Sequence, residues 1–175
     1  MARLNKEQIE NALRELGAAA AREGLYVRLL VVGGAAMVLG YGARERTQDV
    51  DAVILAPEDA ARVRRLAASI AAKLGLPPDW LNDAAKGYVR PPVQETIVLE
   101  APGITVAMPS SAQLAAMKFS AWRDDLDVAD AERLLREIKG AGMSRAEAWE
   151  AVRPYLAPGT ELKAKYAFEE LWETI

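Results

Sequence analysis

The stretch that decides the fold is residues 29–55, LLVVGGAAMVLGYGARERTQDVDAVIL. One apolar run ends at Gly33-Gly34, and a second begins within Asp49-Val50-Asp51. Short apolar runs bounded by glycine or polar residues are typical of buried strands, and residues 35–39 between them have the composition of a short helix. The stretch therefore predicts a strand, a helix and a second strand.

The two aspartates occupy alternate positions where the second strand begins. Alternate residues of a strand point to the same face, so both carboxylates would lie side by side and repel each other unless they hold a cation. A glycine pair after a strand lets the backbone approach a bulky anion such as a triphosphate. By itself, the glycine pair could be a tight turn, and the aspartate pair could be a solvated strand end. Together they predict a metal–nucleotide site, in which Asp49 and Asp51 bind metal and Gly33 and Gly34 bind phosphate.

Composition limits the chemistry of such a site. The chain has 175 residues, of which 51% are hydrophobic and 27% charged, as expected for one compact soluble unit. It has no cysteine and no histidine, which excludes disulfides, thiolate-bound zinc and imidazole catalysis. Any metal should be bound by oxygen, which favours Mg²⁺ or Mn²⁺.

Charge and hydropathy bear on partners and location. The net charge is −3 and no long basic run is present, so sequence-independent wrapping of nucleic acid is not expected. The N-terminus leads into a charged amphipathic helix rather than a signal peptide, and no apolar stretch approaches the ~20 residues that span a bilayer. We therefore expect a cytoplasmic protein that does not bind membranes.

The remaining pattern predicts an α/β fold of the α+β kind, with a mixed sheet flanked by helices. We expect residues 1–109 to form this core and residues 110–175 to form a helical part packed on it as one compact unit. Residues 77–92 contain four prolines and one glycine and are predicted to be an irregular loop over a site. Helices are predicted over 6–22, with Asn5 as the N-cap, 57–74, 110–123, 127–139, 144–155 and 159–172, and strands over 27–32, 50–55, 96–100 and 104–107.

Other residues could complete the site. Arg46 and Thr47 precede the aspartates, where a guanidinium and a hydroxyl could reach a triphosphate; the alternative is a turn with a surface arginine. Glu95 and Glu100 flank the next strand but point to opposite faces, so at most one could be a third carboxylate, and the sequence does not decide which.

Lys118 and Asp127 form a second candidate pair. Lys118 lies at the edge of an apolar stripe with Leu114 and Ala121, where an ammonium needs a partner or a phosphate unless it snorkels to water. Asp127 could be the N-cap of the following helix, or it could face Lys118 across two helices and form an ion pair. If Lys118 serves a phosphate, Lys118→Met should lower turnover about tenfold or more and leave the melting temperature unchanged or slightly higher. Loss of folding would instead show a structural ion pair.

Four segments carry a family resemblance: Gly33-Gly34-x-Ala36, Arg46-Thr47-x-Asp49-x-Asp51, Trp80-Leu81-Asn82-Asp83-Ala84, and the stretch from Met117-Lys118 to Asp127-x-x-Asp130. Together they resemble the DUF6036 nucleotidyltransferases, relatives of the AbiEii-type toxins of bacterial and archaeal toxin–antitoxin pairs. The likeness spans roughly residues 25–140.

The resemblance assigns metal binding to Asp49 and Asp51 and implicates Lys118 and Asp127 in activity. In that family an arginine lies two residues before the threonine. Here Glu45 holds that position between Arg44 and Arg46, so either arginine could contact the nucleotide.

The function implied by the resemblance is that of a metal-dependent nucleotidyltransferase. It would bind Mg²⁺ or Mn²⁺ and ATP or another NTP, and transfer a nucleotidyl group to a hydroxyl of RNA, such as a tRNA end, or of a protein. Such an enzyme could be the toxin of a toxin–antitoxin pair, with a cognate antitoxin as partner. The alternative is a catalytically inactive nucleotide-binding or antitoxin-like partner protein, which need not retain the carboxylate pair.

Overall fold

The chain forms two compact units in the structure, a computed structural model that describes residues 3–175. The first unit comprises the described residues up to Lys86 together with Glu95–Met108. The second comprises Gly87–Gln94 and Pro109–Ile175. The second unit therefore contains a segment that precedes the last strands of the first.

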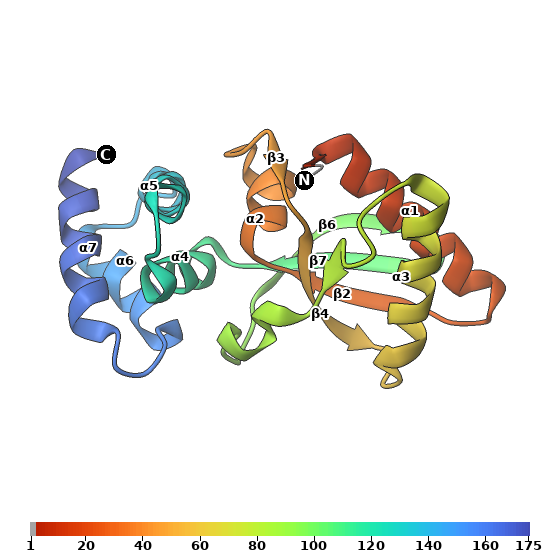
Figure 1. Ribbon diagram of the computed structural model, residues 1–175. Helices are drawn as coiled ribbons and strands as arrows, with labels where there is room; N and C mark the ends of the chain where they lie inside the picture. The colour runs from red at the N-terminus through yellow and green to blue at the C-terminus, as the bar shows by residue number, and fades with distance from the viewer. Residues whose placement is uncertain (1–2) are drawn as a thin grey trace. The chain divides into compact units, whose positions relative to one another are not determined.

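A mixed five-stranded sheet organises the first unit, and with the helices it makes the α+β fold that the sequence predicts (Figure 1). The strand order is β5-β4-β2-β7-β6, and β1 pairs separately with β3. The central strand β2 is antiparallel to β4 and parallel to β7, and β4 is parallel to β5. The strands are β1 (Leu4–Asn5), β2 (Val27–Val31), β3 (Arg46–Thr47), β4 (Val50–Ala56), β5 (Leu81–Asn82), β6 (Glu95–Ala101) and β7 (Ile104–Pro109).

Two helices of this unit, α1 (Lys6–Arg22) and α3 (Ala60–Leu74), contact each other and pack on the sheet. Asn5 caps α1, since its side chain accepts from the Gln8 backbone N–H while the Gln8 side chain accepts from the Asn5 N–H. The predicted N-cap is thereby confirmed. Apolar side chains of α1 and β7, such as Leu13, Leu16 and Val106, are fully buried in the core.

A short helical segment follows the glycine pair. It starts as α2 (Gly33–Ala36) and continues as the π-helical turn η1 (Met37–Tyr41). The sequence predicted a helix here. Residues 77–92, predicted to be irregular, contain strand β5 and the 3₁₀ helix η2 (Ala84–Tyr88).

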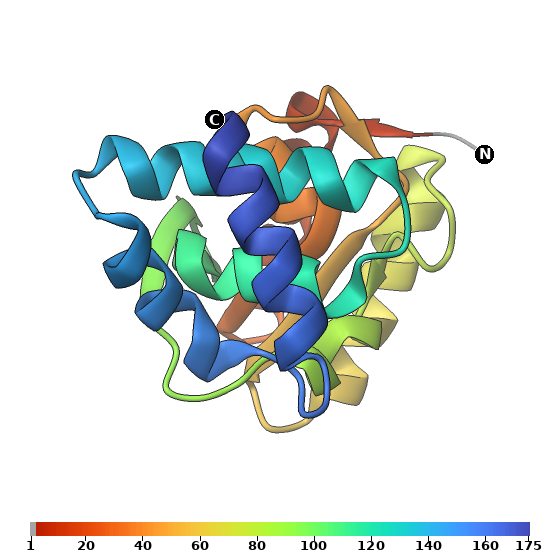
Figure 2. The same cartoon turned by 90° about the vertical axis from the view of Figure 1, so that its left-hand side faces the viewer.

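The second unit is helical, with α4 (Ser111–Ala121), α5 (Asp125–Gly140), α6 (Arg145–Val152), η3 (Arg153–Tyr155) and α7 (Glu161–Thr174). Figure 2 shows α7, in dark blue, crossing α4 and α5, with which it is in contact. Its core includes Phe119 and Phe168, whose rings meet edge to face with centroids 6.1 Å apart. Within residues 3–175, no helix combines the length and the apolar character needed to cross a membrane.

Candidate metal–nucleotide site

The glycine pair lies directly against the aspartates in the first unit. Gly33 follows β2 with a φ of +60°, a left-handed conformation that favours glycine. A Cβ on Gly33 would lie 2.9 Å from Asp51 Oδ2, so the Asp51 carboxylate occupies the space that a side chain would need. The backbone N–H of Val32 also donates to the Asp51 carbonyl at 2.9 Å. The end of β2 and the start of β4 thus bring a bare backbone and a carboxylate together.

Thr47 and Arg44 lie next to Gly34, the second residue of the glycine pair. A Cβ on Gly34 would collide with Thr47 Oγ1 and would lie 3.6 Å from an Arg44 guanidinium nitrogen. Thr47 is buried because strand β3 pairs with β1, opposite Leu4. Arg46 is exposed on the same strand. Of the two arginines between which the sequence did not choose, Arg44 is therefore the one that lies at the glycine pair.

Asp49 lies in the bend just before β4 and is half-buried. Its Oδ2 accepts a hydrogen bond from Asn82 Nδ2 at 3.0 Å. Asn82 is on β5, opposite Asp51 in the parallel pairing of β4 with β5. The two aspartates of the predicted pair are thus anchored differently, Asp51 over Gly33 and Asp49 beside Asn82.

The donor set suits a hard divalent cation. Asp49 and Asp51 offer carboxylate oxygens, the ligand type that Mg²⁺ and Mn²⁺ prefer, and the Asp51 carboxylate lies directly against Gly33. Neither candidate for a third carboxylate joins them. Glu95 pairs with Arg28 at 2.7 Å, and Glu100 is exposed on β6, which β7 and β2 separate from β4. Over residues 3–175, no three acidic, histidine or cysteine residues are grouped to hold a metal ion.

Filling the space at Gly34 should destabilise the first unit. In Gly34→Ala the new methyl group would meet Thr47 Oγ1 and lie 3.2 Å from Thr47 Cβ, so we expect a loss of about 1–3 kcal/mol in the free energy of unfolding. The double variant Gly34→Ala/Thr47→Ala removes the colliding hydroxyl and should lose less than the sum of the single variants in chemical denaturation. Strict additivity would show that the two residues do not touch.

Lys118 belongs to a buried ion cluster in the second unit. Its Nζ lies 3.0 Å from Asp127 Oδ1 and 2.6 Å from Asp130 Oδ2. Exposed fractions are 7% for Lys118, 1% for Asp127 and 2% for Asp130, so the charges are shielded from water. The predicted ion pair of Lys118 with Asp127 is confirmed. The expectation that Lys118→Met would leave stability unchanged is revised, because two buried carboxylates depend on this ammonium.

The turn between α4 and α5 builds the cluster. Trp122 ends α4 in a left-handed conformation, with a φ of 41°, and stacks on Phe119. The Asp124 side chain then accepts from the N–H groups of Leu126 and Asp127 and is the N-cap of α5. Of the two roles that the sequence left open for Asp127, the N-cap is therefore wrong and the ion pair with Lys118 is the one observed. Asp127 lies in the first turn of the helix, three residues after the N-cap, where it faces Lys118.

Asp127 stays ionised in this environment. Burial by itself would raise the pKa of its carboxyl, but hydrogen bonds from the Arg123 side chain, the Arg123 backbone N–H and Lys118 outweigh it and lower the pKa to about 2. The Arg123 bonds, from Nε at 3.1 Å and from the N–H at 3.0 Å, both reach Oδ2. Each carboxylate oxygen of Asp127 is therefore occupied by cationic or backbone donors.

This lowered pKa predicts acid sensitivity. Because the folded pKa is about 2 and the ordinary value is 3.8, the stabilisation is present above about pH 4 and is lost as the pH falls toward 2. We expect it to contribute about 2 kcal/mol to the free energy of unfolding. Urea unfolding between pH 5 and pH 2 should show a steeper loss in the wild type than in Asp127→Asn, which cannot titrate. Equal slopes would contradict the assignment.

Asn82 and Asp130 stand in segments that carry the family resemblance, but no individual role was predicted for either of them. Asn82 gave no local signal, because a strand of two residues has no periodicity and is defined only by its pairing with β4. Asp130 did give one. Together with Asp127 it falls on the helical stripe of Leu134 and Ile138, where acidic residues need a buried partner.

The structure places the four residues implicated in activity in two units, with Asp49 and Asp51 in the first and Lys118 and Asp127 in the second. No protein-family model, curated protein or solved structure matches the chain. The resemblance to nucleotidyltransferases therefore stays a prediction.

Proposed function

We propose that the chain is a metal-dependent nucleotidyltransferase whose nucleotide site is the one described in the first unit. The observation that carries the proposal is the contact of Gly33 and Gly34 with the Asp51 carboxylate and the Thr47 hydroxyl, which leaves no room for a side chain on either glycine. A backbone kept bare beside a carboxylate and a hydroxyl suits a phosphate–cation pair, because amides bind phosphate oxygens and carboxylates bind the cation.

In this proposal Asp49 and Asp51 would hold Mg²⁺ or Mn²⁺, and the ion would neutralise charge on the phosphate oxygens. The Gly33 and Gly34 backbone would orient the triphosphate. The Thr47 hydroxyl and the Arg44 guanidinium, both next to Gly34, would donate hydrogen bonds to it. These contacts position the α-phosphorus for attack, which is the main requirement in phosphoryl chemistry.

The proposed reaction balances without a further reactant. The acceptor hydroxyl oxygen bonds to the α-phosphorus, the bond from this phosphorus to the β-phosphate oxygen breaks, pyrophosphate leaves, and the hydroxyl proton passes to solvent. The acceptor would be an RNA, such as a tRNA end, or a protein hydroxyl. A toxin role with a cognate antitoxin is the biological setting that the family resemblance suggests.

The test is transfer of label. The protein is incubated with Mg²⁺, total RNA or cell lysate, and each of the four NTPs labelled at the α-phosphate. We expect one or more NTPs to label RNA or protein only when Mg²⁺ or Mn²⁺ is present. Binding of NTP without any labelled product would favour the inactive nucleotide-binding protein. The absence of both NTP binding and labelled product would overturn the proposal.

A further inference from the structure

Contacts other than those of the Asn82 side chain help to fix the segment that contains Asn82. Trp80 is fully buried, and its indole N–H donates to the Ala67 carbonyl on α3 at 2.9 Å. The Trp80 carbonyl accepts from the Val50 N–H at 2.6 Å, and β5 then runs parallel to β4 with Asn82 opposite Asp51. Asn82 is thus held beside the aspartates by the backbone and by a buried indole.

Both ends of the Asn82 side chain are engaged. Its Oδ1 accepts from the backbone N–H of Ala84 at 3.0 Å, and its Nδ2 donates to Asp49 Oδ2 at 3.0 Å. A backbone N–H can only donate, so the carbonyl end of the amide must face Ala84 and the amino end must face Asp49. The hydrogen-bond network therefore fixes the orientation of this amide.

A neutral donor is the chemically suitable partner for a carboxylate that binds a cation. A lysine or arginine at this position would compete with the cation for the Asp49 charge. An amide N–H orients the carboxylate and leaves its charge in place. Hydrogen-bonding groups that orient metal ligands typically affect metal affinity or activity 10- to 100-fold.

From this geometry we infer that Asn82 is a positioning residue, which holds the Asp49 carboxylate in the orientation that binds the divalent cation. The inference rests on the proposed function, because it assigns a role toward the metal of that site. In this inference the buried Trp80 side chain helps to hold β5 at the register that brings Asn82 to Asp49.

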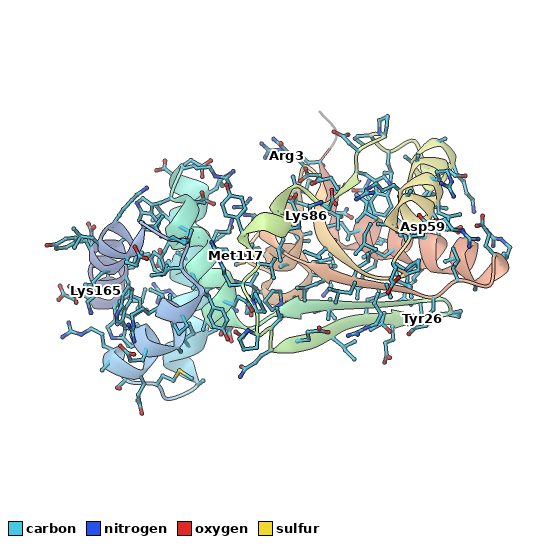
Figure 3. All side chains as sticks on the ribbon, turned by 90° about the horizontal axis from the view of Figure 1, so that it is seen from below. Arg3, Tyr26, Asp59, Lys86, Met117 and Lys165 are labelled. Atoms are coloured by element: carbon cyan, nitrogen blue, oxygen red, sulfur yellow. The ribbon has the colours of Figure 1, made fainter. Side chains whose placement is uncertain are left out.

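The test titrates Mg²⁺ alone into the ¹⁵N-labelled protein and follows the amide resonances of Gly33 and Gly34. We expect Asn82→Ala to bind Mg²⁺ about tenfold or more weakly than the wild type. The matched control is Asp83→Asn, which breaks the surface ion pairs with Arg64 and Lys86 (Lys86 is labelled in Figure 3) and leaves Asn82 unchanged. It should keep the wild-type affinity.

A second measurement does not require Asn82→Ala to fold. In the metal-free protein, Asp49→Ala should shift the side-chain amide resonances of Asn82, because it removes their acceptor. Unshifted resonances, or equal Mg²⁺ affinities in the wild type and Asn82→Ala, would overturn the positioning role and leave the proposed function standing. A wild-type protein whose Gly33 and Gly34 resonances do not respond to Mg²⁺ would overturn the metal site itself, and this inference with it.

Discussion

Lys118→Met is expected to lower the free energy of unfolding by about 3–5 kcal/mol, because removing one partner of a buried ion cluster leaves uncompensated charge. The ammonium faces two carboxylates, Asp127 and Asp130, that are 1% and 2% exposed. Methionine keeps the length and the packing of the side chain but removes its charge. Urea or thermal unfolding followed by circular dichroism measures the effect.

Two comparisons isolate the cause. Lys163→Met makes the same replacement at an exposed position of α7 and should change stability by less than about 0.5 kcal/mol. The triple variant Lys118→Met/Asp127→Asn/Asp130→Asn removes all three charges and should recover much of the loss. If Lys118→Met alone were as stable as the wild type, Lys118 would not be required to neutralise the cluster.

Asp51→Asn is expected to lower nucleotidyl transfer at least about 100-fold, equivalent to about 2.7 kcal/mol of transition-state stabilisation. Asparagine keeps the shape of the group over Gly33 but cannot neutralise a divalent cation. Stability should change little. The measurement is the initial rate with the NTP that the labelling experiment selects, at several Mg²⁺ concentrations.

The control for Asp51→Asn is Asp59→Asn, the same replacement at the exposed residue that precedes α3 (labelled in Figure 3). It should keep full activity. If expression of the wild type slows cell growth, growth should recover with Asp51→Asn and not with Asp59→Asn. A well-folded Asp51→Asn protein with wild-type turnover would show that Asp51 is an ordinary strand residue.

Local pattern was enough to predict most elements of the fold. The Asn5 cap, the strand before Gly33 and the strand after Asp49 follow from capping chemistry and from short apolar runs. The contact of the glycine pair with Asp51 follows less directly. It depends on the antiparallel pairing of β2 with β4, which the order of motifs suggests but does not determine.

The features of the structure that could not be predicted depend on which strands pair or on which of several similar residues takes a given position. Asp124, Asp125 and Asp127 are all suitable helix caps by residue type. The left-handed turn at Trp122 and the partner that Lys118 needs decide that Asp124 caps the helix and Asp127 lies inside it. Neither the turn nor the depth of Lys118 is evident from the local sequence.

The interleaving of the two units along the chain has a consequence for folding during synthesis. The ribosome releases the strands β2 and β4 first, then residues 87–94 of the second unit, and only afterwards β7, the parallel neighbour of β2. The backbone carbonyl of Arg90 in the intervening segment accepts a hydrogen bond from the Gln113 side chain at 2.6 Å, and Gln113 is synthesised later still, after β7. Neither unit can therefore be obtained by cutting the chain at one point, and a nascent chain that ends before α4 carries an unpartnered piece of the helical unit. We expect neither unit to complete its folding until β7 and α4 have been synthesised.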